Sequence, residues 1–121
     1  MTRRHPEQQL QQAVARYLDV ALPGEVWWTT IPAGGGGKVR GAILKGLGYK
    51  AGTPDILIVY EGRAYWMELK APDGVLSTAQ MWCFKVLCNA GCWRPHIVRS
   101  LVDVERALDS WRIPHRATVA A

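Results

Sequence analysis

The chain has 121 residues, 49% of them hydrophobic, and it contains six tryptophans. This length suits one domain, and this composition excludes a chain that is disordered throughout. The formal net charge of +5 favours a polyanionic partner such as nucleic acid, although charge alone does not establish one.

The chain lacks the apolar runs that direct proteins to membranes. No apolar segment follows the basic N-terminus, and no apolar segment elsewhere approaches the roughly 18 residues that a membrane span needs. We therefore expect a cytoplasmic protein with no membrane partner, and three cysteines without disulfides. Cys88, Cys92 and His96 match no standard zinc spacing, so a place in the core is preferred for the cysteines.

Hydrophobic periodicity and turn residues predict eight secondary-structure elements. In chain order they are a helix over 6–21, a strand over 26–31, a helix over 39–47, strands over 55–60 and 63–70, a helix over 77–91, a strand over 93–98 and a helix over 100–111. The tail from Ile113 is expected to be frayed. This order predicts a single α/β domain over 1–121, with its core at about 7–111 and a mixed sheet flanked by helices.

The segment Ala33–Lys38 contains four glycines in succession, which predicts a loop. It is not a phosphate-binding loop of the Walker type, because valine follows Lys38 where serine or threonine is required. One interpretation is a flexible connector. The other is a backbone that bends round nucleic acid, with Lys38 and Arg40 contacting phosphate.

The predicted helix ends carry polar residues with two possible uses. Glu7 lies on the apolar stripe of the first helix, and an acid in a first turn is stabilised by the helix dipole. Position alone favours that interpretation over a carboxylate directed at an active site. Ser77 and Gln80 have the spacing of a capping box, and Gly91 lies where a C-terminal cap is expected.

Two acids and a lysine converge at one end of the predicted hairpin. If Glu61 and Gly62 form a two-residue turn, counting back from it places Asp55 opposite Glu68. Because side chains alternate along a strand, Lys70 shares the face of Glu68. A one-residue error in register would undo this pairing.

Facing carboxylates need a neutralising partner, because like charges opposite each other destabilise a sheet. Their oxygens suit Mg²⁺ or Mn²⁺, which can stabilise charge on a phosphate. Lys70 could orient or deprotonate a water molecule or stabilise the transition state. The alternative is a strand-end salt bridge between Lys70 and either acid.

Pro54-Asp55 followed by Glu68-Leu69-Lys70 resembles the Pro-Asp…(Asp/Glu)-x-Lys signature of restriction-endonuclease-like nucleases. The segment Gly74–Gln80 follows at short range, and Glu7 precedes the signature on the opening helix. The whole order, from about Glu7 to Leu108, resembles the virus-type replication-repair nuclease (VRR-NUC) domain, and so implies a restriction-endonuclease-like core.

The resemblance implies roles for individual residues. Asp55, Glu68 and the backbone carbonyl of Leu69 would be ligands of Mg²⁺ or Mn²⁺, and Lys70 would be the catalytic lysine. Glu7 would lie near the metal, as a ligand directly or through water.

Gln80 would point toward the active site. Its role in a capping box with Ser77 is a rival, and we expect the two roles to compete for one side-chain rotamer. Nucleic-acid contacts are assigned to Lys38, Arg40 and Lys45.

Stand-alone domains that resemble this chain are associated with phages and prophages. The resemblance implies a homodimeric endonuclease that cuts branched DNA, notably four-way (Holliday) junctions, in a bacterial or phage-infected cell. Two alternatives remain, an exonuclease or flap nuclease of the same fold and a DNA-binding module that does not cleave. Exposed tryptophans would support a dimer, although core packing is preferred for most of the candidates, which are Trp27, Trp28, Trp82 and Trp111.

Overall fold

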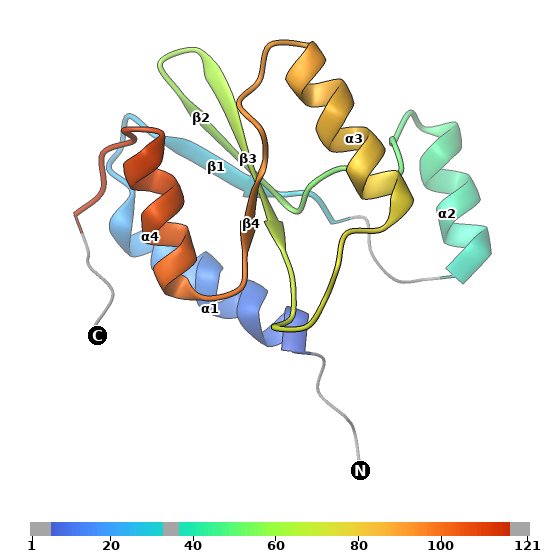
Figure 1. The fold of residues 1–121 in the computed structure, drawn as a ribbon, viewed down its shortest axis with the longest axis horizontal. Coiled ribbons are helices and arrows are strands. Elements are labelled where there is room, and N and C mark those ends of the chain that lie inside the picture. The colour runs from blue at the N-terminus through green and yellow to red at the C-terminus, as the bar shows by residue number, and fades with distance from the viewer. Residues whose placement is uncertain (1–5, 33–36, 117–121) are drawn as a thin grey trace.

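The computed structural model describes residues 6–32 and 37–116 of the chain (Figure 1). Their order is the one expected from the sequence: α1 (Pro6–Ala21), β1 (Trp27–Thr30), α2 (Gly37–Gly46), β2 (Ile56–Tyr60), β3 (Arg63–Leu69), α3 (Thr78–Asn89), β4 (His96–Val98) and α4 (Leu101–Ser110). Of the expected loop over 33–38, residues 33–36 lie outside the described residues. The remainder is helical because α2 begins at Gly37, so Lys38 lies on a helix rather than in a loop.

The strands form one mixed sheet, as predicted, and their order in it is β1-β2-β3-β4. β3 and β4 are parallel, and the other neighbours are antiparallel. Tyr60 pairs with Arg63 across the turn, where Glu61 and Gly62 have φ values of 50° and 74°. Positive φ at both central residues belongs to the type I′ turn that joins hairpin strands with a fixed register.

The two faces of the sheet are covered differently. α1 and α4 cover one face, and α3 lies on the other side (Figure 1). Tyr65, Met67 and Leu69 of β3 point into the core between the sheet and α1 and α4. Because side chains alternate, Trp66 and Glu68 point to the face of α3. The remaining buried core residues are Val14, Leu18, Leu22, Val26, Ile56, Ile58, Val98, Val104, Ala107, Leu108 and Ile113.

The structure corrects two sequence expectations near the C-terminus. The expected strand over 93–98 is shortened to His96–Val98, because Pro95 has no backbone N–H to offer a neighbouring strand. Ile113, the start of the expected frayed tail, is 2% exposed and packs in the core. The backbone N–H of Arg116 donates to the Ala21 carbonyl at 2.9 Å, which ties this segment to the end of α1.

α2 stands apart from the core. It has no buried residues, and Val39 and Ile43 on one side of it, with Leu47 directly after it, are exposed. None of the described helices is long and apolar enough to span a bilayer.

Candidate active site

The acid pair lies at one end of the central hairpin, where the predicted register places it. Asp55 directly precedes β2, Glu68 lies on β3 and Lys70 directly follows β3. The Asp55 carboxylate accepts a hydrogen bond from the backbone N–H of Leu69, with 2.7 Å between N and Oδ2. This bond holds Asp55 against the neighbouring strand beside Glu68.

Glu68 is a buried acid whose hydrogen bonds are incomplete. Its side chain is 2% exposed. Oε2 accepts from Nε2 of Gln80 at 3.2 Å, whereas Oε1 is buried and has no hydrogen-bond partner among the described residues. Burial, followed by the hydrogen bond and negative charge of Asp55, raises the pKa of Glu68 from 4.5 to about 9.

Lys70 is buried beside the acids without being paired to them. It is 9% exposed, and its charge acts to lower the pKa of Glu68, against the larger effects of burial and Asp55. No ion pair joins Lys70 to an acid within the described part of the chain. The alternative of a strand-end salt bridge is therefore wrong. A buried amine without a carboxylate partner is free to act on a third group in the site.

Gln80 performs both of the roles that were expected to compete. Its Oε1 accepts from the backbone N–H of Ser77 at 2.8 Å, while Ser77 Oγ accepts from the backbone N–H of Gln80 at 3.1 Å. These two bonds complete a capping box at the start of α3. The Nε2 atom of the same amide donates to Glu68. The expectation of one exclusive rotamer is wrong, because the two ends of the amide serve the two roles at once.

Gly52 brings the loop before Asp55 against the first turn of α3. Its φ is +82°, a conformation that side chains rarely adopt. A Cβ at this position would overlap the Ala79 carbonyl and would lie 2.7 Å from the backbone nitrogen of Gln80. Glycine is therefore required for the loop of Asp55 to meet the helix of Gln80.

Two residues near the site were not predicted from the sequence. Tyr49 lies within electrostatic range of the acids: burial is the largest cause that raises its pKa, and the charges of Asp55 and Glu68 contribute. Arg99 donates from Nη1 to the carbonyls of Ala71 at 2.7 Å and Gly74 at 2.8 Å, so it shapes the loop that follows Lys70. Both contacts depend on tertiary structure, and no local pattern signals them.

The oxygen atoms at this end of the hairpin fit a hard divalent cation. In a strand, the N–H and C=O of one residue point to the same side, so the Leu69 carbonyl is directed toward Asp55 as its N–H is. The unpartnered Oε1 of Glu68 is a third oxygen with an unfilled interaction. Carboxylate and carbonyl oxygens are the ligands that Mg²⁺ and Mn²⁺ prefer.

Glu7 is in the first turn of α1 and is exposed. Its negative charge is the smallest of the causes that act on the pKa of Glu68. Across residues 6–32 and 37–116, no three side chains of His, Cys, Asp or Glu are grouped so that they could hold a metal ion. The oxygens that fit a cation are therefore those of Asp55, Glu68 and the Leu69 backbone.

The three basic residues assigned to nucleic-acid contacts all lie on α2. Lys38, Arg40 and Lys45 are exposed. The guanidinium of Arg40 donates to the Pro32 carbonyl at 3.2 Å, which connects α2 to the end of the segment that follows β1. Lys38 and Lys45 are seven positions apart, so they project from one side of the helix.

Comparison with known proteins bears on the fold. No family model and no curated protein matches the chain. A solved structure described as a VRR_NUC domain protein matches it with a TM-score of 0.71 and 17% sequence identity, over 99% of each chain. The chain has the VRR-NUC fold. The resemblance inferred from the Pro-Asp and Glu-x-Lys motifs is thereby confirmed at the level of the fold.

In this VRR-NUC fold the acid pair lies where three elements meet. The hairpin of β2 and β3 supplies Asp55, Glu68 and the Leu69 carbonyl, the end of β3 supplies Lys70, and α3 supplies Gln80. The arrangement can bind a cation through oxygen and can place an amine beside it.

Proposed function

We propose that the chain is a metal-dependent DNA endonuclease that hydrolyses phosphodiester bonds. The observation that carries this proposal is the buried Glu68 carboxyl, which faces Asp55 with one oxygen unpartnered among the described residues. A buried acid in contact with a second acid destabilises a fold unless a proton or a cation lies between them. A site for Mg²⁺ or Mn²⁺ explains why the fold tolerates this pair.

Each residue of the site has a distinct task in this proposal. Asp55, Glu68 and the Leu69 carbonyl are the metal ligands, and Glu7, which is not grouped with these two acids among the described residues, completes the set through water. A divalent cation held there supplies Lewis-acid polarisation of a phosphate oxygen. Lys70 holds or removes a proton of the attacking water, or stabilises charge that develops on the phosphate. Gln80 fixes the Glu68 carboxyl through its 3.2 Å hydrogen bond.

We propose branched DNA, and four-way junctions in particular, as the substrate. The chain carries a net charge of +5, which suits a polyanion. The described residues form one nuclease-like fold, and this part of the protein would recognise DNA through its shape and backbone charge. Lys38, Arg40 and Lys45 of the exposed α2 would contact phosphates.

We further propose that two copies act together. A four-way junction has two symmetric strands to cut, which a two-fold dimer matches. The exposed stripe of Val39 and Ile43 on α2 and Leu47 directly after it is covered by nothing among the described residues, and a second copy would bury it. These side chains are 75%, 58% and 80% exposed.

The direct test is cleavage of three end-labelled substrates in Mg²⁺ or Mn²⁺: a four-way junction, a linear duplex and a single strand. We expect the wild type to make symmetric cuts in the junction and Lys70→Ala to make none. Lys85→Ala is the matched control, because Lys85 is an exposed lysine whose ammonium lies over the Trp82 ring.

The remaining outcomes separate the alternatives. Cleavage that requires a free DNA end, and stops when both ends are blocked, would favour an exonuclease or flap nuclease. If folded wild-type protein binds DNA but cuts none of the substrates in either metal, the nuclease proposal is wrong and a non-cleaving DNA-binding module remains.

A further inference from the structure

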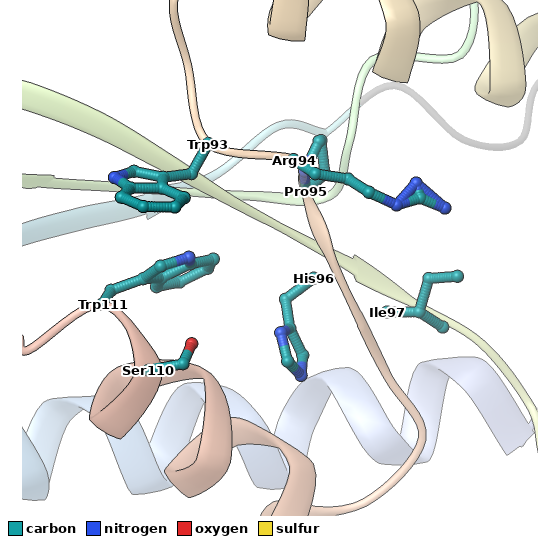
Figure 2. Close-up of a pocket in the computed structure, with 7 residues that line it drawn as sticks. All are labelled: Trp93, Arg94, Pro95, His96, Ile97, Ser110 and Trp111. Carbon is teal, nitrogen blue, oxygen red and sulfur yellow. The ribbon is translucent and has the colours of Figure 1, made fainter.

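A pocket of about 460 Å³ lies beside β4, at the edge of the sheet and outside the acid site (Figure 2). Its volume falls within the range of roughly 300–1,000 Å³ that is typical of small-molecule sites. Trp93 and Trp111 are its largest lining residues, and Arg94, His96 and Ser110 are its polar ones. No acidic side chain lines it among the described residues.

The two indoles differ in how firmly they are held. Trp111 has Tyr65 as a ring neighbour at 5.2 Å and His96 at 6.0 Å, so its orientation is fixed by the core. Trp93 is 59% exposed and has no such ring neighbour among the described residues. Figure 2 shows the two side chains on opposite sides of the pocket. A fixed indole facing an exposed one provides stacking surfaces for a flat group.

The polar groups of the pocket suit a nucleotide. Arg94 lines one side of the pocket, and its guanidinium extends away from Trp93 and Trp111 to lie 5.1 Å from the centre of the Phe84 ring (Figure 2). Burial lowers the pKa of His96, so at neutral pH the imidazole can both donate and accept hydrogen bonds. An aromatic platform with a cation beside it is the usual arrangement for an unpaired base and its phosphate.

The pocket is next to the proposed active site in the sheet. Ile97 lines the pocket and pairs with Glu68 across β3 and β4. Neighbouring strands are separated by only about 4.8 Å. The pocket and the acid pair therefore lie on adjacent strands, near enough for one bound DNA strand to contact both.

We propose that this pocket binds one unpaired nucleobase of the DNA substrate, stacked between Trp93 and Trp111, with the DNA backbone continuing toward Arg94. The inference deepens the proposed function and relies on it for the choice of DNA as the ligand. It gives the protein a preference for branch points that contain unpaired bases over fully paired junctions.

The test measures binding by Lys70→Ala protein, so that DNA is bound without being cut. The probes are a fully paired four-way junction and the same junction with two unpaired nucleotides at the branch point, one of them 2-aminopurine. We expect Trp93→Ala in this background to weaken binding of the unpaired probe about tenfold, the scale of one base–aromatic stack. Its binding of the paired junction should change less than twofold.

Two variants control for the loss of an indole. Trp82→Ala removes another exposed tryptophan, 64% exposed on α3 and not among the residues that line the pocket, and should leave both affinities unchanged. Trp93→Phe keeps a stacking ring and should retain most of the binding. Stacking on an indole should quench 2-aminopurine fluorescence, and Trp93→Ala should restore it. Thermal unfolding should stay close to that of the parent because Trp93 is exposed.

The inference would be overturned if Trp93→Ala and Trp82→Ala bound the unpaired probe with equal affinity and quenched its 2-aminopurine fluorescence equally. A fall in molecular mass caused by Trp93→Ala would also overturn it, because the pocket would then be a contact between two copies. Failure of the proposed function is distinguishable: wild-type protein would cut no DNA in Mg²⁺ or Mn²⁺, whether or not Trp93→Ala weakens binding.

Discussion

Burying Glu68 next to Asp55 lowers the stability of the fold, although the proposed metal site requires both acids. A buried carboxyl against a second acid favours the protonated form, and this raises its pKa to about 9. The folded protein therefore holds a proton that the unfolded chain releases above pH 4.5. The metal-free protein should lose stability as the pH rises from about 4.5 to about 9, because the unfolded state then binds fewer protons than the folded state.

We expect Glu68→Gln to remove this dependence. A glutamine has no charge to bury and can donate its amide N–H to Asp55. In EDTA at pH 8, the variant should be more stable than the wild type by on the order of 2 kcal/mol, with a Tm higher by several degrees. Thermal unfolding of the wild type and the variant at pH 5 and pH 8 measures the gain in stability and the loss of its pH dependence. A variant that is less stable than the wild type at both pH values would contradict the account.

At the residue scale, the sequence predicted the acid pair because the turn is local. Glu61-Gly62 forces a two-residue connection, and simple counting then places Asp55 opposite Glu68. The roles of Tyr49 and Arg99 could not be predicted in this way. Each depends on where a distant segment meets the site: Tyr49 on the loop after α2, and Arg99 on the segment that follows β4.

At the scale of elements, α3 links helix capping to the acid site through Gln80. Ser77→Ala removes the cap and leaves the amide of Gln80 in place, so it should cost about 1 kcal/mol of stability and leave cleavage largely intact. Gln80→Ala removes the cap acceptor and also the donor to Glu68. It should cost similar stability and lower the cleavage rate at least tenfold.

Thermal unfolding and single-turnover cleavage, measured below the melting range of both variants, compare the two effects. If Ser77→Ala and Gln80→Ala slow cleavage equally, then Gln80 acts only as a helix cap and its proposed role at the site is wrong.

The sequence predicted the order of elements better than their ends. Periodicity does not reveal that Pro95 keeps the pairing of β4 from extending back to Trp93. Nor does it reveal that Ile113 packs in the core. Periodicity also predicted a helix over 39–47, without revealing that no other described element would cover this helix. Whether a helix packs on the core depends on the complete set of tertiary contacts, which no window of sequence contains.

At the scale of the whole molecule, α2 gives a test of the proposed dimer. We expect Ile43→Glu to shift the molecular mass from two chains toward one, because it places a charge in the stripe that a second copy would bury. Light scattering coupled to gel filtration measures the mass. Val20→Glu is the matched control, because Val20 is 64% exposed and lies on α1. A wild type that has the mass of one chain at all concentrations would contradict the dimer.

The central claim is that Asp55 and Glu68 together hold a divalent cation beside Lys70. Calorimetric titration of Mn²⁺ at pH 8 tests it most directly, with Asp55→Asn, Glu68→Gln and Lys70→Ala measured alongside the wild type. We expect the wild type and Lys70→Ala to bind Mn²⁺ and both acid variants to lose that binding, while Lys70→Ala cuts no DNA. Equal binding by the wild type and Glu68→Gln, or no binding by folded wild type, would contradict the account.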